Sequence, residues 1–454
     1  MTTTSTLRTG SGRWIGGWNP EDEQFWEREG KHVARRNLYL SIFTEHLGFS
    51  VWSIWSVMVL FMSPAIGLGF TAGEKFLLVC TPTLVGALLR LPYSYAVTRY
   101  GGRNWTVFST SILLIPTLLT CWFVQQPGTP LWVFLVLGAL TGVGGGNFAS
   151  SMTNITTFYP QRLQGWALGL NAGGGNLGVP VVQLIGLGVI AFVGNTSPAY
   201  VAGVYLPLIV IGALLAAWKM DNVDAVRSEP GALRDSAREP HTWWISLLYI
   251  GTFGSFIGYG FAFGLVLQSQ FDFTALQAAS YTFLGPLLGS LSRPFGGRMS
   301  DRWGGAVVTL WTFVGLALGT ALLLVASAQN SFPLFLGAFT ALFLLAGIGN
   351  GSVYKMIPAV FAKKAEDDVT SGGDVTAAFA QARRMSGAVI GIAGAVGASG
   401  GVGINLAFRA SYGSEAASGD AAFVTFLAFY AVCVLVTWAV YLRRGRSTPE
   451  AADA

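Results

Sequence analysis

The chain has 454 residues, of which 52% are hydrophobic and only 11% are charged, and 59 are glycine. Soluble proteins carry about 25% charged residues, so this composition excludes an ordinary soluble domain and indicates a membrane protein. The net charge of +5 is concentrated in the predicted loops and tails, so it reports orientation in the membrane, and no nucleic-acid partner is expected.

Apolar runs long enough to cross a bilayer, about 20 residues each, recur along the whole chain. Only helices and closed barrels can span lipid, so these runs predict an all-α membrane protein with 12 transmembrane helices. In chain order the predicted helices are 38–63, 76–98, 105–124, 131–153, 164–193, 199–219, 242–268, 276–297, 306–326, 333–361, 386–405 and 421–442.

The basic residues predict the orientation, because cytoplasmic loops are enriched in Lys and Arg. With the N-terminus inside, 22 of the 27 Lys and Arg residues fall in cytoplasmic segments and two fall outside. Both termini are therefore predicted to be cytoplasmic. The expected organisation is a tail, a six-helix half, a linker, a second six-helix half and a short tail, at residues 1–36, 37–219, 220–241, 242–442 and 443–454.

No signature of enzyme chemistry occurs in the sequence. The three cysteines all fall in predicted helices, and the three histidines are scattered at positions 32, 46 and 241. No residues stand at metal-ligand spacing. We therefore expect a protein that is not an enzyme and has no catalytic residues, no metal and no cofactor.

The chain repeats itself at an offset of 203 residues. GALLRLPYSYAVTRYGG begins at Gly86 and GSLSRPFGGRMSDRWGG at Gly289, so that Arg90 matches Arg293. Two six-helix halves related by a repeat of this kind resemble the major facilitator superfamily. The predicted fold is therefore the major facilitator fold. In repeats of this kind the substrate site lies near the bilayer midplane between the halves.

Arg90 and Arg293 fall well inside predicted helices, where an arginine costs at least about 2.5–3.5 kcal/mol on insertion scales. Snorkelling to an interface or a structural ion pair could account for them. However, Glu45 is the one carboxylate of 22 that falls in a predicted helix, which leaves the interior positive. We therefore predict that both arginines bind a substrate anion. Their guanidinium groups are planar and donate pairs of parallel hydrogen bonds, which favours a small planar oxyanion as the substrate.

Two glycine-rich stretches, GWALGLNAGGGNLG and SGAVIGIAGAVGASGG, repeat at an offset of 222 residues. Glycine removes side chains where membrane helices approach closely, which predicts a narrow site. Tight packing without ligand contact is the alternative for each of them. The glycines concerned are Gly165, Gly169, Gly173, Gly174, Gly175, Gly387, Gly391, Gly397 and Gly400.

Several segments resemble the nitrate/nitrite porter family. GALLRLPYS, GGGNFASSM, ALGLNAGGGNLGV and LLYIGTFGSFIG carry the resemblance, which extends from about Trp52 to Tyr441. It implies that Arg90 and Arg293 clamp nitrate or nitrite. The other predicted substrate-binding residues are the hydroxyl donor Tyr249, the signature amide Asn176, the sandwiching rings Phe49, Phe148 and Phe253, and the repeat pair Asn147 and Asn350.

Glu45, His46 and Lys355 are ionisable residues inside predicted helices and are candidates for proton coupling. Intramembrane carboxylates and histidines often mark proton relays. A static pair between Glu45 and Lys355 is the alternative. Adjacent residues diverge by about 100° on a helix, so we expect Glu45 to face Lys355 and His46 to be more peripheral.

SDRWGG at 300–305 and RYGGR at 99–103 resemble the loop motif of the superfamily. Arg99, Asp301 and Arg302 are predicted to be gate or structural charges. An equally weighted alternative is that these three residues only form turns and cap helices.

The sequence thus predicts a multi-pass transporter of the bacterial inner membrane that moves nitrate or nitrite by alternating access. Nitrate/proton symport is the leading prediction, and nitrate/nitrite antiport is the alternative. A nitrate receptor ranks lower, because the predicted tails are too short to hold a signalling domain. The expected partners are the anion, protons and the lipid bilayer, and a monomer is expected.

Overall fold

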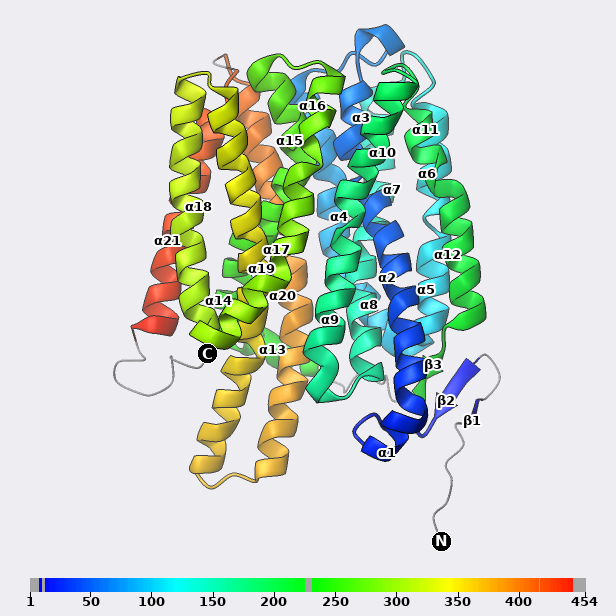
Figure 1. Ribbon diagram of the computed structural model, residues 1–454, viewed down its shortest axis with the longest axis vertical. Helices are drawn as coiled ribbons and strands as arrows, with labels where there is room; N and C mark the ends of the chain where they lie inside the picture. The colour runs from blue at the N-terminus through cyan, green and yellow to red at the C-terminus, as the bar shows by residue number, and fades with distance from the viewer. Residues whose placement is uncertain (1–7, 10–12, 225–230, 416, 444–454) are drawn as a thin grey trace.

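The computed structural model describes residues 8–9, 13–224, 231–415 and 417–443. Its long helices run side by side between the two ends of one bundle (Figure 1). The predicted tail at 443–454 lies almost entirely outside the described residues, as do residues 1–7, 10–12 and 225–230 of the predicted N-terminal tail and linker.

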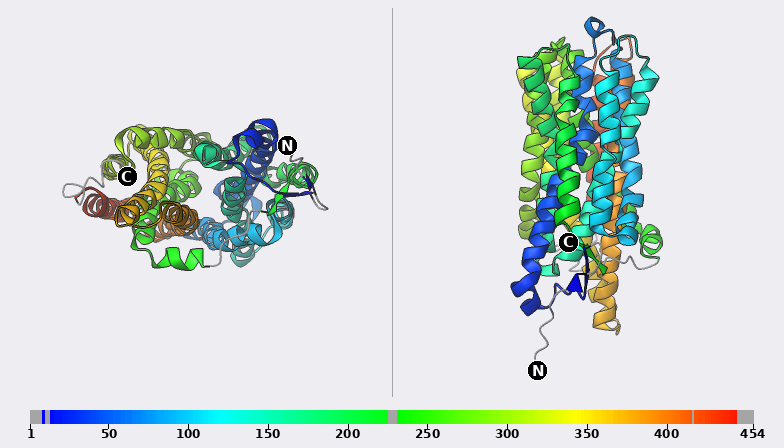
Figure 2. Two further views of the ribbon diagram at one scale, coloured as in Figure 1. Left: turned by 90° about the horizontal axis from the view of Figure 1, so that it is seen from below. Right: turned by 90° about the vertical axis from the view of Figure 1, so that its right-hand side faces the viewer.

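All twelve predicted membrane segments are helical over nearly their whole length. The earlier helices, coloured blue to green, gather on one side of the bundle, and the later ones, green to red, on the other (Figures 1 and 2). The first group contains α1 (Glu23–Phe25), α2 (Lys31–Ser53), α3 (Trp55–Phe61), α4 (Ala72–Tyr100), α5 (Gly102–Ser111), α6 (Leu114–Phe123), α7 (Leu131–Thr141), α8 (Val143–Phe158), α9 (Gln161–Asn176), α10 (Gly178–Phe192), α11 (Ala199–Gly203) and α12 (Tyr205–Lys219). The second contains α13 (Ala232–Arg238), α14 (Pro240–Tyr249), α15 (Ser255–Phe271), α16 (Ala275–Thr282), α17 (Leu284–Trp303), α18 (Gly305–Ala328), α19 (Phe332–Thr370), α20 (Val375–Tyr412) and α21 (Asp420–Val436).

Ten helical segments of the described chain are long and apolar enough to cross a membrane. The predicted segments 38–63 and 276–297 are not among the ten. They form α2–α3 and α16–α17, and both pairs lie within the bundle beside the others (Figure 1). Their polar side chains lower the hydropathy, and among these are the site residues Glu45 and Arg293.

The repeated R-[YW]-G-G motif ends two equivalent helices. Gly101 follows α4 with φ 87°, and Gly304 follows α17 with φ 83°. A positive φ favours glycine because a β-carbon would clash there. Arg99 and Arg302 lie in the last turns of these helices, where a cation interacts favourably with the helix dipole. This placement agrees with the capping alternative for both arginines.

α19 and α20 continue well past the predicted segments 333–361 and 386–405. The connection expected between them is mostly helical, and the two helices protrude together from one end of the bundle (Figures 1 and 2).

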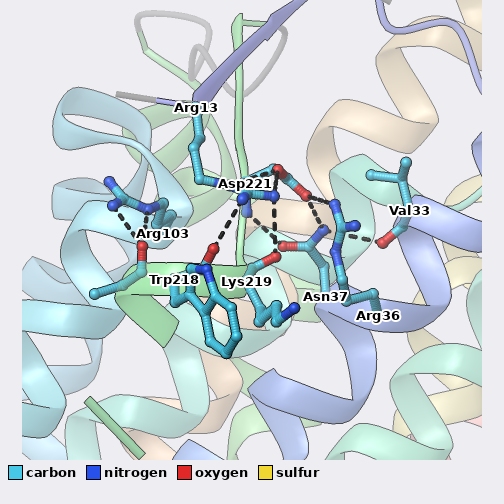
Figure 3. A network of polar contacts seen from close by, with 9 residues as sticks. Arg13, Val33, Arg36, Asn37, Arg103, Trp218, Lys219 and Asp221 are labelled. Atoms are coloured by element: carbon cyan, nitrogen blue, oxygen red, sulfur yellow. Dashed lines mark hydrogen bonds and ion pairs between the residues drawn. The ribbon is translucent and has the colours of Figure 1, made fainter. Parts of the chain in front are cut away.

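A polar network ties the N-terminal segment to the end of α12 (Figure 3). Strand β2 (Trp14–Gly16) pairs antiparallel with β1 (Arg8–Thr9) and parallel with β3 (Asn222–Val223). The Asp221 carboxylate, 2% exposed, accepts hydrogen bonds from Arg13 at 2.7 Å, Arg36 at 2.5 Å and Asn37 at 2.8 Å. One buried carboxylate just after α12 therefore contacts α2 and the residue that precedes strand β2.

Replacing Asp221 with alanine removes the shared acceptor of this network. We expect Asp221→Ala to lower the free energy of unfolding by about 2 kcal/mol, since hydrogen bonds to charged groups contribute about 1.5–3 kcal/mol. Thermal unfolding of the purified protein in detergent measures the change. Asp224→Ala is the control, because Asp224 is exposed. Equal Tm values for the two variants would contradict the role of Asp221.

Candidate anion-binding site

Arg90 lies fully buried in the middle of the bundle. It belongs to α4, which packs along α20 and α8, and its side chain is 0% exposed. Its guanidinium carbon lies 4.6 Å from the centre of the Phe148 ring and 4.8 Å from that of Phe253. Because no part of the side chain reaches the surface, the snorkelling alternative is excluded for Arg90.

The Arg90 guanidinium donates one side-chain hydrogen bond, and two of its nitrogen atoms have no partner in the described part of the chain. Nη1 donates a hydrogen bond of 2.9 Å to the main-chain oxygen of Gly394 in α20. Nε and Nη2 are buried and have no hydrogen-bond partner among the described residues. These two N–H groups form one edge of the guanidinium plane, and such an edge binds two oxygens of an oxyanion in parallel.

Arg293 of α17 is the equivalent residue of the second half and is 7% exposed. Its Nη2 donates to the Tyr249 hydroxyl at 3.3 Å. Its guanidinium carbon lies 5.1 Å from the centre of the Tyr354 ring. Nη1 is buried and has no hydrogen-bond partner in the described part of the chain. Arg293 thus also presents a free donor.

Neither arginine is neutralised by a carboxylate. Among the described residues, no ion pair within 4 Å involves Arg90 or Arg293. A buried charge is costly unless it is paired. The structural ion pair that was the alternative explanation is therefore not formed in this structure, and the geometry favours an anion as the partner.

The predicted aromatic residues gather around Arg90. Phe148 lies 6.1 Å from both Phe49 and Phe253, and Phe253 stacks on Tyr249 at 5.1 Å. Phe253 lies within a π-helical stretch at Ile250–Gly254, and Tyr249 immediately precedes it. Such stretches often occur at functional sites. In this structure Phe148 and Phe253 contact the guanidinium itself, whereas the resemblance implied that they sandwich the anion.

The three predicted asparagines are buried, but the structure does not join them to the arginines by hydrogen bonds. Asn147, Asn176 and Asn350 are at most 4% exposed. Each has a side-chain oxygen without a hydrogen-bond partner among the described residues. Their role in substrate binding stays a prediction.

Glu45 of α2 is 1% exposed, and its carboxylate is held by an amide. Oε2 accepts a hydrogen bond of 2.6 Å from Asn171, whose Nδ2 also contacts Ser151 Oγ at 2.7 Å. Oε1 is buried without a hydrogen-bond partner in the described residues. His46 Nδ1 lies 3.2 Å from the Gly174 main-chain oxygen. Adjacent residues of α2 therefore contact different neighbours.

The predicted pairing of Glu45 with Lys355 is wrong. Lys355 Nζ lies 2.6 Å from Asp301 Oδ1, and the two side chains are 46% and 58% exposed. Lys355 follows Tyr354 in α19, and one helical step of about 100° turns it towards α17, which packs along α19. Asp301, predicted as a gate or structural charge, is thus the partner of Lys355.

The glycines fall into two groups. Four meet close neighbours where a β-carbon would stand: Gly174 meets Ile42, Gly175 meets Glu45, Gly397 meets Tyr249 and Gly400 meets Ile250. At the other positions the expected close packing is not found, because no described atom lies within 4 Å of the β-carbon position. These are Gly165, Gly169, Gly173, Gly387 and Gly391.

Four residues at the site were not predicted from the sequence. Trp52 lies 5.7 Å from the Arg90 guanidinium, and Gly394, Asn171 and Tyr354 contact site residues as described above. A polar residue inside an apolar stretch is the available signal for Asn171 and Tyr354. Tyr354 also lies one helical turn after Asn350. No sequence signal separates Trp52 from ordinary packing residues.

Comparisons with known proteins agree with this architecture. The model of the Major Facilitator Superfamily matches residues 38–403. The nitrate/nitrite transporter NarU of Escherichia coli (strain K12) is 42% identical over 94% of this chain and 96% of its own length. The probable nitrate/nitrite antiporter NarK2 of Thermus thermophilus is 34% identical over 98% of this chain and all of its own.

A solved structure supports the fold alone. The crystal structure of a bacterial homolog to the human lysosomal transporter Spinster, inward-facing and unoccupied, has a TM-score of 0.61 at 16% identity. The structural match covers 89% of this chain and 96% of the Spinster homolog's chain. Together with the ten apolar spans, the comparisons confirm the major facilitator fold and a multi-pass inner-membrane transporter. They also confirm the prediction that the chain is not an enzyme.

Arg90→Lys keeps the positive charge but removes the planar edge. We expect the affinity for a planar oxyanion to fall at least about tenfold, because an ammonium group cannot bond Gly394 and also present two parallel donors. Calorimetric titration of the purified protein with sodium nitrate measures the Kd. Arg99→Lys, at the exposed end of the same helix, is the control. An unchanged Kd in Arg90→Lys would show that Arg90 is structural.

Gly175→Ala places a methyl group against the Glu45 carboxylate. We expect it to destabilise the protein by about 1–3 kcal/mol, the usual cost of overpacking. Gly169→Ala is the matched control in α9, since no described atom lies within 4 Å of its β-carbon position. Thermal unfolding in detergent compares the two variants. A loss of stability in Gly169→Ala equal to that in Gly175→Ala would argue against the close contact.

Proposed function

Because this chain belongs to the nitrate/nitrite porter family of the major facilitator superfamily, we propose that it carries nitrate across the bacterial inner membrane by alternating access. Nitrite is proposed as a second substrate. Protons are proposed to move in the same direction as the anion.

The unpaired donors of Arg90 and Arg293 carry this proposal. Both guanidinium groups are buried, and three of their nitrogen atoms have no hydrogen-bond partner among the described residues. Nitrate is planar and can place two oxygens against the Nε–Nη2 edge of Arg90 while another oxygen approaches Nη1 of Arg293. The ion also offsets part of the repulsion between the two arginines.

The position of the arginines in different halves links binding to conformational change. Arg90 belongs to α4 and Arg293 to α17, so one anion held by both connects the two groups of helices. Such an anion stabilises a closed state more than an open one, and this difference in affinity shifts the conformational equilibrium. From the closed state the protein opens to the other side of the membrane.

Glu45 is the proposed proton carrier. Its Oε1 has no hydrogen-bond partner in the described chain, and Asn171 holds Oε2. A protonated carboxyl group becomes a donor as well as an acceptor, so this site accommodates both protonation states. Nitrate entering against a negative interior potential moves about 2.3 kcal/mol uphill per 100 mV. Driving uptake by that potential therefore requires more than one proton per anion.

Nitrate/nitrite antiport is the second candidate, and the printed name of the Thermus thermophilus relative favours it. In an antiporter, the protein changes sides only when an anion is bound. Sealed proteoliposomes that contain only this protein distinguish the two mechanisms. Nitrate addition acidifies the lumen in a symporter, whereas an antiporter requires nitrite or nitrate on the other side and moves no protons.

Glu45→Gln is expected to abolish net nitrate uptake driven by a pH gradient and to leave nitrate exchange within about twofold of wild type, because exchange needs no proton release. Both rates are measured in the same proteoliposomes. Glu74→Gln is the control, since glutamine also completes the capping box with Thr71 at the start of α4. Full gradient-driven uptake in Glu45→Gln would exclude Glu45 as the carrier. Loss of exchange as well would indicate a structural role.

A further inference from the structure

Tyr354 places a buried hydroxyl group close to both arginines of the site. It belongs to α19, and its ring lies 5.1 Å from the Arg293 guanidinium carbon and 5.1 Å from the centre of the Tyr249 ring. Its hydroxyl oxygen is buried and has no hydrogen-bond partner among the described residues. A buried polar group without a partner is costly, so this hydroxyl is expected to have a ligand as its partner.

Gly394 relates Tyr354 to the other arginine. A β-carbon at Gly394 would stand 3.6 Å from Arg90 Nη1, 3.8 Å from Tyr354 Oη and 4.0 Å from an edge atom of Phe148. The Tyr354 hydroxyl and the Arg90 guanidinium therefore flank the same small space beside α20. Glycine at this position leaves that space open.

The site holds more unpartnered donors than two oxygen atoms need. Arg90 Nε and Nη2, Arg293 Nη1 and the Tyr354 hydroxyl are all buried without a hydrogen-bond partner among the described residues. The guanidinium edge binds two oxygens of a planar oxyanion. The third oxygen of a trioxo anion has lone pairs for both Arg293 Nη1 and the hydroxyl, whereas nitrite presents only two oxygens.

We propose that Tyr354 is a specificity-determining residue, whose hydroxyl donates a hydrogen bond to the third oxygen of nitrate. This inference rests on the proposed function. Nitrite lacks that oxygen and gains nothing from the hydroxyl. A site built to hydrogen-bond a substrate atom discriminates against an analogue without it, because its own polar group is then left unpaired. Tyr354 thus favours nitrate over nitrite.

Tyr354→Phe tests the proposal because it removes one oxygen atom and keeps the ring against Arg293. The Kd values for sodium nitrate and sodium nitrite are measured by calorimetry on the purified full-length protein. We expect the Kd for nitrate to rise about tenfold, as the loss of a hydrogen bond to a charged group implies. The Kd for nitrite should change by less than about twofold. The nitrate-to-nitrite selectivity therefore falls.

Tyr205→Phe is the matched control. Tyr205 of α12 also has a buried hydroxyl without a hydrogen-bond partner among the described residues, but no contact links it to either arginine. It should leave both Kd values unchanged. Equal weakening of nitrate and nitrite in Tyr354→Phe, or no weakening of either, would overturn the specificity role. Failure of the wild-type protein to bind either anion would instead overturn the proposed function itself.

A second variant keeps the test decisive if Tyr354→Phe does not fold. Gly394→Ala adds a methyl group at ordinary contact distances from Arg90, Phe148 and Tyr354, so the fold should tolerate it. The methyl group occupies the space between the hydroxyl and Arg90, and we expect the same selective loss of nitrate affinity. An unchanged selectivity in a well-folded Gly394→Ala protein would contradict the proposal.

Discussion

The buried Arg90 guanidinium is the feature on which the centre of this protein depends. Its desolvation is offset on one side by the Gly394 carbonyl and on the ring faces by Phe148 and Phe253. These partners come from α20, α8 and the stretch after α14, which belong to both groups of helices. A permanently charged group thus holds the interface between the groups, and it still keeps one edge free. The same contacts that make burial tolerable leave the Nε–Nη2 edge without a hydrogen-bond partner among the described residues.

The two halves contribute different polar groups to the interior of the bundle. The first half carries the carboxyl group of Glu45 and the second half the phenol of Tyr249, each four residues before a phenylalanine, Phe49 and Phe253 respectively. Tyr249 accepts a hydrogen bond from Arg293, whereas Glu45 accepts one from Asn171. The two halves therefore differ in the partner of this polar group, which is an arginine in the second half and an asparagine in the first.

The interior contacts also explain why polar helices lie inside the bundle. α2 and α17 carry Glu45 and Arg293, and neither is apolar enough to be recognised as a span by hydropathy alone. Neighbouring helices supply their polar groups with partners that lipid cannot supply. Large apolar side chains such as those of Phe192 and Leu214 are exposed on other helices. Polarity alone therefore separates these two helices from the ten recognised spans, because other helices of the site, such as α4 and α19, are among the ten.

Much of the fold followed from the sequence alone, because spanning length, positive loops and an internal repeat are local or periodic properties. The same repeat paired Arg90 with Arg293, and counting carboxylates within the predicted helices indicated an interior with excess positive charge. Tertiary structure decided what lies next to each side chain. Lys355 pairs with Asp301 rather than Glu45, because one helical step turns it out of the interior. The rotation of each helix about its axis and the approach of α20 to α4 brought Gly394 and Tyr354 to the arginines. These are contacts between segments far apart in the chain, and no local pattern encodes them.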